Sequence, residues 1–334
     1  MTGSSGVEVE LKTLTEGQND INELKSEVTQ KSVFKRVIIP WILMFVIQFA
    51  YTGQNYTVDT WPVPEYSLLS VSCIASTIFL FFFSKFTVKE EQPKMQPYDH
   101  FLMLCCGLAL TIGAQMLLFL GIRNLTNLAS VGAMMPGITI FVYVLSVIFR
   151  LERIKNNIKK TIGLFITLLG IILAMTQTID LNSGTLGLIY LVGDTFCFAL
   201  HIVLGAILSQ RGFDSRYIAY MINLHALPFL LIITFATEGI QFQMDYLPSI
   251  LYNAIVMFSI VTVLYIFVVS IMPGGAPIVS LSILIQPLSN ALVDVINGRA
   301  VFSLLFIIAN ILMAFGMIYA VLSSMNDKTV VNES

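Results

Sequence analysis

Two acidic side chains fall inside long apolar stretches of the sequence, where an ionisable group is costly and by default a functional candidate. Asp194 lies about eight residues into the stretch 185–208, hence roughly 12 Å from its start at 1.5 Å per residue of helix. Asp294 lies near the end of the stretch 275–296, where we expect water to be close. Asp194 is therefore the sharper candidate for contact with a polar ligand.

A histidine follows on the same helical face. His201 is seven residues after Asp194, which places it two turns deeper if the stretch is a helix. Because histidine titrates near neutral pH, such a pair could relay protons, and the carboxylate could bind the ammonium group of an amino acid. The alternative is that both side chains only satisfy local hydrogen bonds inside a helix bundle.

A second polar stripe runs along the stretch 275–296. Its members recur at i, i+4 spacing: Ser282, Gln286, Asn290 and Asp294. This face cannot point at lipid without cost, so we expect it to line a cavity or to contact a neighbouring helix. In the stretch 127–149, Asn127 and Ser130 share a face and would form the opposite wall.

The elements that must position these side chains are membrane spans. The 334 residues are 56% hydrophobic and only 11% charged, whereas a soluble domain carries about 25% charged residues. About 20 apolar residues cross a hydrocarbon core of ~30 Å. The sequence predicts ten such spans, at 34–52, 65–85, 99–121, 127–149, 160–178, 185–208, 216–236, 248–270, 275–296 and 301–323.

The basic residues predict the orientation of these spans. If residue 1 is cytoplasmic, 16 of the 18 Lys and Arg fall on the inner side, and only Arg123 and Arg299 fall on outer connections. Because flanking basic residues decide orientation, both termini are predicted to be cytoplasmic. Residues 1–33 are expected to form a disordered tail, and residues 324–334 a C-terminal tail. No basic tract of the kind that binds nucleic acid occurs.

The cysteines and the sequons carry less information. All four cysteines fall inside spans and show no zinc spacing, so we expect no metal site and no disulfide framework. The sequons beginning at Asn55 and Asn124 lie on predicted outer segments close to the membrane.

The two halves of the chain have similar sequence patterns. Pro136 and Pro287 each follow small or polar residues and precede an apolar run. Because five is an odd number, the two copies of a five-span repeat, 34–178 and 185–323, must enter the membrane from opposite sides. Secondary transporters are commonly built in this way, with the substrate site near the midplane. A proline removes one helical hydrogen bond, so the two prolines are candidate hinges, although proline is also simply common in membrane helices.

Seven segments carry a resemblance to a known family. They are Gln48–Gly53, Thr111–Gly121, Ala129–Thr139, Ile148–Glu152, Gly275–Pro277, Gln286–Ser289 and Ile318–Tyr319. They resemble the EamA-type drug/metabolite transporter superfamily and are most similar to the plant walls-are-thin-related (nodulin-like) exporters. One departure is Asn297-Gly298-Arg299, which stands where the second repeat usually has an acidic residue.

The resemblance implies an all-α membrane protein of ten transmembrane helices, arranged as two inverted five-helix repeats around a cavity with alternating access. It implies small metabolites such as amino acids or auxin-like amphipathic solutes, no cofactor, and a plasma or vacuolar membrane. Gln48 and Gln115 resemble cavity positions of the family, and Tyr51, Tyr143 and Tyr265 could stack a planar substrate or merely pack.

Other functions stay open at this point. A nucleotide-sugar or phosphorylated-metabolite antiporter would need basic residues for phosphate, and no Lys or Arg lies deep in a span. An intramembrane aspartyl protease would need two facing acids, but Asp194 and Asp294 differ in depth, so we expect no enzyme. A membrane scaffold, proton coupling and a homodimer are left open. The transporter interpretation requires Asp194, Gln115 and Gln286 to share one cavity.

Overall fold

The computed structural model describes residues 39–61, 63–88, 91–125, 127–151, 158–178, 184–271, 279–299 and 303–331, and none of these residues forms a β-strand. The chain divides into two units, residues 1–42 and residues 43–334. The packing described below lies within the second unit. The expected N-terminal tail and residues 34–38 of the first predicted span lie outside the described residues.

Ten helical spans are found among the described residues, one for each predicted stretch. Several are built from more than one helical segment. Their segments are α2 (Ile39–Thr60); α3 (Glu65–Thr87); α4 (Pro97–Leu108), η2 (Ala109–Gln115) and α5 (Met116–Arg123); α6 (Leu128–Met134) and α7 (Gly137–Ile148); α8 (Ile158–Thr178); α9 (Thr185–Gln210); α10 (Ser215–Thr237); η3 (Met244–Tyr246), α11 (Leu247–Leu251), η4 (Tyr252–Val261) and α12 (Thr262–Ile271); η5 (Ser280–Leu284) and α14 (Ile285–Ile296); and α15 (Leu304–Val331).

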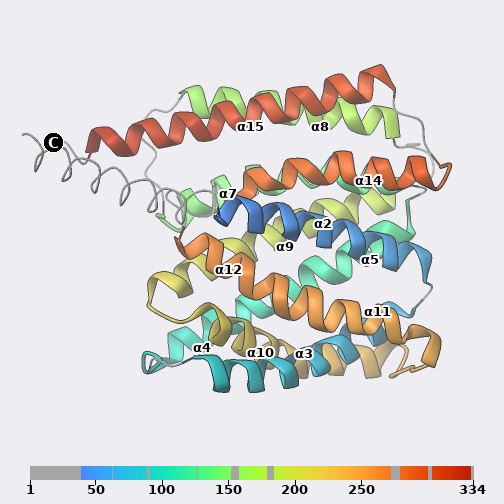
Figure 1. Ribbon diagram of the computed structural model, residues 1–334, viewed down its shortest axis with the longest axis vertical. Coiled ribbons are helices and arrows are strands. Elements are labelled where there is room, and N and C mark those ends of the chain that lie inside the picture. The colour runs from blue at the N-terminus through green and yellow to red at the C-terminus, as the bar shows by residue number, and fades with distance from the viewer. Residues whose placement is uncertain are drawn as a thin grey trace, which may run out of the picture. The chain divides into compact units, whose positions relative to one another are not determined.

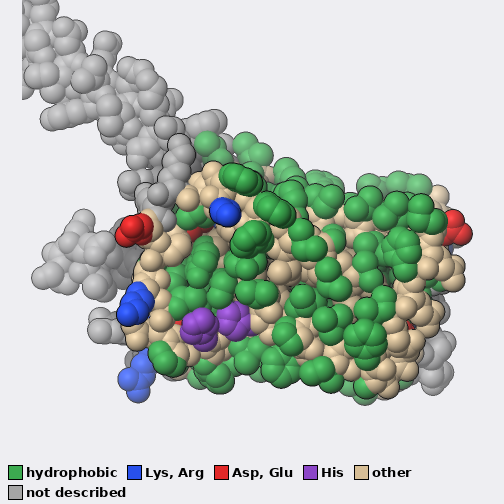
Figure 2. Space-filling model, turned by 90° about the horizontal axis from the view of Figure 1, so that it is seen from below, with side chains coloured by type: hydrophobic (Ala, Val, Ile, Leu, Met, Phe, Trp, Pro, Cys, Tyr) green, Lys and Arg blue, Asp and Glu red, His purple; other side chains and the backbone are tan. Residues whose placement is uncertain are grey.

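Six of these helices have the length and the composition of membrane spans. Six described spans are long and apolar enough to cross a bilayer, and Thr161–Gln177 and Leu304–Ala320 are shorter apolar helices. The helices of the second unit run along a common direction (Figure 1). On the face shown in Figure 2, hydrophobic side chains cover the middle and charged ones lie toward the two ends. Large side chains such as Phe86 and Ile158 are more than 70% exposed, as lipid contact allows. The chain is therefore a multi-pass membrane protein.

Several spans depart from regular α-helix at the positions that border the site. The third span changes to a π-helix at η2, and the eighth does so at η4. The fourth span breaks at Met135 and Pro136, between α6 and α7. The ninth contains a 3-10 helix, η5, and Pro287 is the third residue of the α-helix that follows it. Such irregularities are frequent at functional sites.

The first span is longer than the sequence predicts, and this corrects the expectation for Asn55. Helix α2 continues to Thr60, beyond the expected end at residue 52. Asn55 therefore lies inside the helix and is only 1% exposed. The placement of its sequon on an outer connection was wrong, and a glycan cannot be attached to this side chain in the folded protein.

Ion pairs join the connections at both ends of the spans. At the end predicted to be inner, Arg211 pairs with Asp99 at 2.5 Å and Arg216 pairs with Asp214 at 2.7 Å. At the end predicted to be outer, Arg123 pairs with Glu65 at 2.7 Å. Asp214 caps α10, and the side-chain hydrogen bond from Arg216 holds the pKa of its carboxyl below the ordinary value of 3.8.

This lowered pKa predicts a pH dependence of stability. The ionised Asp214 carboxylate stabilises the folded state above pH 3.8, and that contribution is lost as the pH falls through the lower folded-state pKa. In Asp214→Asn the cap is kept, since asparagine is an equally good N-cap, but the ion pair is lost. Wild type should have the higher thermal unfolding midpoint in detergent above about pH 5, and the difference should vanish at acidic pH. If the unfolding midpoints of wild type and Asp214→Asn differ by the same amount at neutral and at acidic pH, the assigned ion pair is contradicted.

Candidate functional site

Nine residues from five spans line one cavity in the second unit. They are Tyr51, Asn55, Gln115, Leu118, Met135, Ile138, Asp194, Phe198 and Gln286. The centre of a water molecule can reach about 10 Å³ of this space, which is about the room for one water. The lining residues lie roughly 7–20 Å from the predicted outer ends of their helices at 1.5 Å per residue. The cavity is therefore small, and it lies near the middle of the bilayer.

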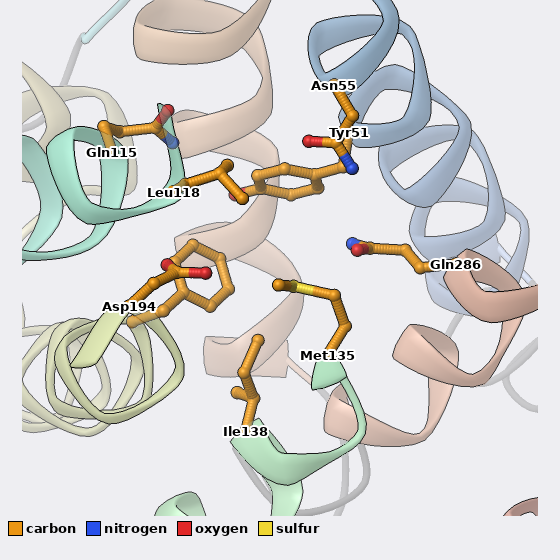
Figure 3. Close-up of a pocket in the computed structure, with 9 residues that line it drawn as sticks. Tyr51, Asn55, Gln115, Leu118, Met135, Ile138, Asp194 and Gln286 are labelled. Atoms are coloured by element: carbon orange, nitrogen blue, oxygen red, sulfur yellow. The ribbon is translucent and has the colours of Figure 1, made fainter. Parts of the chain in front are cut away.

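Asp194 supplies the negative charge of this cavity. Helix α9 carries it, and its carboxyl points inward, across the cavity from Gln286 (Figure 3). The side chain is 3% exposed, and its Oδ2 atom has no hydrogen-bond partner. The lining includes no Lys or Arg. A buried carboxylate without a cation is costly, so the site favours a bound positive charge or a proton.

The amide of Gln115 is held by two further amides that do not line the cavity. Gln54 Nε2 donates to Gln115 Oε1 at 2.5 Å and to Asn253 Oδ1 at 2.8 Å. Asn253 Nδ2 in turn donates to the Ser249 carbonyl oxygen at 2.9 Å, which fixes the orientation of the Asn253 amide. This chain of bonds joins α2 to η2 and η4, and it leaves Gln54 Oε1 buried without a partner.

A polar seam joins α2 to the ninth span on the other side of the cavity. We define the α2–α14 seam as Gln48, Thr52 and Asn55 facing Ser282, Gln286, Ser289 and Asn290. Gln286 Nε2 donates to Gln48 Oε1 at 2.7 Å, and Gln48 Nε2 donates to Ser282 Oγ at 2.9 Å. The Thr52 and Ser289 hydroxyls are 2.6 Å apart, and Asn55 Nδ2 donates to Asn290 Oδ1 at 3.4 Å.

The seam continues toward the predicted outer end, where Arg299 pairs with Asp59. Thr52, Asn55 and Asp59 lie between Gln48 and that end of α2, so their contacts join α2 to the ninth span and its end on the predicted outer side of Gln48. Side-chain hydrogen bonds therefore join the two helices along this line.

The predicted site residues thus divide into three groups. Gln115, Asp194 and Gln286 line the cavity together. Gln48, Ser282 and Asn290 belong to the seam beside it. Asn127, Ser130 and His201 lie outside the cavity lining.

The third group has other structural roles. Asn127 caps α6, where its Oδ1 accepts from the Ser130 amide at 2.9 Å and from the Ser130 hydroxyl at 2.7 Å. His201 contacts Cys106, with its Nδ1 atom 3.2 Å from the sulfur. Phe198, which follows Asp194 by one turn, contacts the His201 ring at a centroid distance of 6.0 Å. Asp194 and His201 share a helical face but not the cavity.

Asp294 also differs from the expectation. It is fully buried, although we expected water nearby, and its Oδ2 atom accepts from the Ala129 amide at 2.6 Å. This bond satisfies one free amide at the start of α6, where a negative charge also complements the helix dipole. Asp294 is therefore a capping residue of the fourth span.

Sequence reasoning missed several lining residues. Asn55 was assigned to a connection, although Gln48, Thr52 and Asn55 follow i, i+4, i+7 spacing that would have extended the helix. Phe198 lies one turn from Asp194, and its ring meets that of Tyr51 edge to face at 5.5 Å. Leu118, Met135 and Ile138 carry no signal in the sequence that separates them from ordinary packing residues.

Comparisons with known proteins give information about the fold. No protein-family model and no curated protein sequence matches the chain. Solved structures do match, and one of them, described as "Crystal structure of protein", is 13% identical with a TM-score of 0.64. The similarity covers 85% of this chain and 98% of that chain. At this identity it shows that the fold is shared, and it shows nothing further.

Proposed function

We propose that this chain is a secondary transporter of small organic metabolites, such as amino acids or auxin-like amphipathic solutes, which works by alternating access. One observation carries the proposal. Asp194, Gln115 and Gln286 come from three different spans and line a single cavity near mid-bilayer depth. Buried polar side chains that converge in this way are expensive in a membrane, and they mark solute or ion pathways.

We further propose that the spans form two inverted repeats of the EamA type. If the first five spans exchange with the last five, α3 exchanges with α10, the fourth span with the ninth, and α8 with α15, and the members of each pair pack together. The contact of α3 with η4 exchanges into that of α10 with α4, and both occur. The π-helical segments lie in the third and eighth spans, which also correspond. This pattern supports a two-fold relation between the halves.

The orientation of the protein belongs to the same proposal. The end that carries Arg211 and Arg216 would face the cytoplasm together with both termini, because basic residues gather on that side. The end that carries Arg123 and Arg299 would face outward, or into the lumen of a vacuole. The α2–α14 seam would then be the contact that opens toward that side.

The alternatives receive less support. A phosphorylated substrate needs positive charge in the site, and the lining contains an aspartate but no Lys or Arg. A scaffold needs no acidic side chain in a cavity inside the bundle, yet Asp194 lines such a cavity. The cavity chemistry therefore favours solute transport.

Uptake into liposomes tests the proposal. Purified protein would be reconstituted and exposed to a mixture of small metabolites, and the contents of the vesicles would be measured by mass spectrometry against protein-free vesicles. We expect at least one small organic solute to enter only the protein-containing vesicles, with saturation at high concentration. Equal contents in both sets across amines, amino acids, weak acids and neutral solutes would refute a transport function.

A further inference from the structure

We propose that the cavity binds solutes through a protonated amine, with Asp194 as its counter-ion. This substrate class rests on the proposed transport function and narrows it, because it excludes auxin-like weak acids. Three features of the cavity support this ligand class: the charge of the lining, the hydrogen-bonding atoms that remain free, and the apolar walls.

The charge of the lining has one sign. Asp194 is the charged member of the nine lining residues, and no ion pair joins it to a described basic residue. Its Oδ2 atom is buried without a hydrogen-bond partner. A buried carboxylate that lacks both a cation and a hydrogen-bond donor would gain both from an ammonium group. A solute carboxylate would instead be repelled.

The free oxygens at the cavity point to the same ligand. Asn55 Oδ1 has no partner, while the Asn55 amide nitrogen is turned toward Asn290. The amide nitrogen of Gln286 is likewise used within the protein, since it donates to Gln48. Asp194 Oδ2 and Asn55 Oδ1 are therefore two unpartnered acceptors on the cavity wall, beside one amide donor, Gln115 Nε2, whose oxygen is bound by Gln54. An ammonium group offers three donors and no acceptor, so it matches the two acceptors.

The remaining walls suit an apolar or aromatic body. The rings of Tyr51 and Phe198 lie next to the carboxyl, and the faces of aromatic rings attract cations. Leu118, Met135 and Ile138 add apolar surface. In this structure the space holds a group about the size of one water, which is enough for an ammonium head. A larger body requires the cavity to widen, and separation of the α2–α14 seam would supply that room.

Equilibrium binding to the purified protein in detergent tests the inference. The probes are 2-phenylethylamine and 3-phenylpropanoate, which share the ring and the spacing but differ in the sign of the head-group charge. We expect saturable binding of the amine at pH 7 and none of the carboxylate, relative to protein-free micelles. Asp194→Asn should weaken amine binding at least about tenfold, as expected for the loss of a charge-assisted hydrogen bond. Asp245→Asn, at an exposed position, should bind the amine as wild type does.

The outcomes separate the inference from the transport function. Carboxylate binding as tight as amine binding in wild type would overturn the inference, and this holds even if Asp194→Asn fails to fold. Unchanged amine affinity in a folded Asp194→Asn variant would overturn it too. Amine binding that depends on Asp194, without amine uptake into liposomes, would overturn the transport function and leave the ligand class standing. Uptake of weak acids alone would keep transport and overturn the ligand class.

Discussion

Oxidation of the double variant Thr52→Cys/Ser289→Cys is expected to stop solute uptake almost completely, and reduction should restore it. The two hydroxyl oxygens are 2.6 Å apart in the middle of the α2–α14 seam, so sulfur atoms at the same positions can reach the disulfide bond length of about 2.05 Å. A bond there ties α2 to the ninth span on the predicted outer side of the cavity. If solute crosses by alternate opening of the two sides, a seam that cannot part blocks one half of the cycle.

A second pair of hydroxyls gives a matched control. Ser70 and Thr234 join α3 to α10, and their oxygens are also 2.6 Å apart. Neither residue lines the cavity. Oxidation of Ser70→Cys/Thr234→Cys should therefore form a bond of the same kind and leave uptake close to that of the reduced protein. Full uptake with the Thr52–Ser289 positions bonded would show that solute does not pass between α2 and the ninth span.

The ten helices could be predicted because an apolar stretch of about 20 residues marks each of them in the sequence. Boundaries were predictable only where a span ends in charges or in a turn. Helix α2 shows why other boundaries were predicted incorrectly. Its last two turns contain Gln54, Asn55 and Thr57, which look like a connection when the sequence is read locally. Gln54 and Asn55 donate hydrogen bonds to amide oxygens on other spans, and Thr57 donates to the Gln54 carbonyl oxygen within α2, so these side chains can be buried. The local sequence does not reveal the acceptors on the other spans.

The same distinction separates the site predictions. Asp194 and Gln286 were predictable because a charge or an amide within an apolar stretch needs an inward environment wherever it lies. Asn127 has the same polarity, but it directly precedes an apolar helix, which is the position of an N-cap residue. His201 lies on the same face of α9 as Asp194, but it lies outside the cavity, because the cavity wall ends at Phe198, one turn before His201. Helical periodicity gives the direction of a side chain and leaves open how far the cavity extends.

Replacing Gly107 with alanine is expected to destabilise the fold, although alanine normally favours helix. A Cβ atom at this position would lie 2.2 Å from the Ile222 carbonyl oxygen and 3.1 Å from the Ala226 Cβ, so α4 and α10 would have to move apart. Such overpacking costs about 1–3 kcal/mol, and more when the obstacle is backbone that cannot rotate away. The thermal unfolding midpoint in detergent should therefore fall by several degrees.

The same argument, from the atoms that an added Cβ would meet, predicts the opposite result for Gly205→Ala. This glycine is also buried in a helix, but its added Cβ would lie 3.6 Å from Ile266 Cγ1, an ordinary van der Waals contact. Alanine is better than glycine in a helix by up to roughly 1 kcal/mol, so this variant should be as stable as wild type or slightly more stable. The two substitutions are chemically identical and differ only in what the methyl group meets. Equal midpoints for the two variants would mean that α4 and α10 do not approach each other at Gly107 as the structure has them.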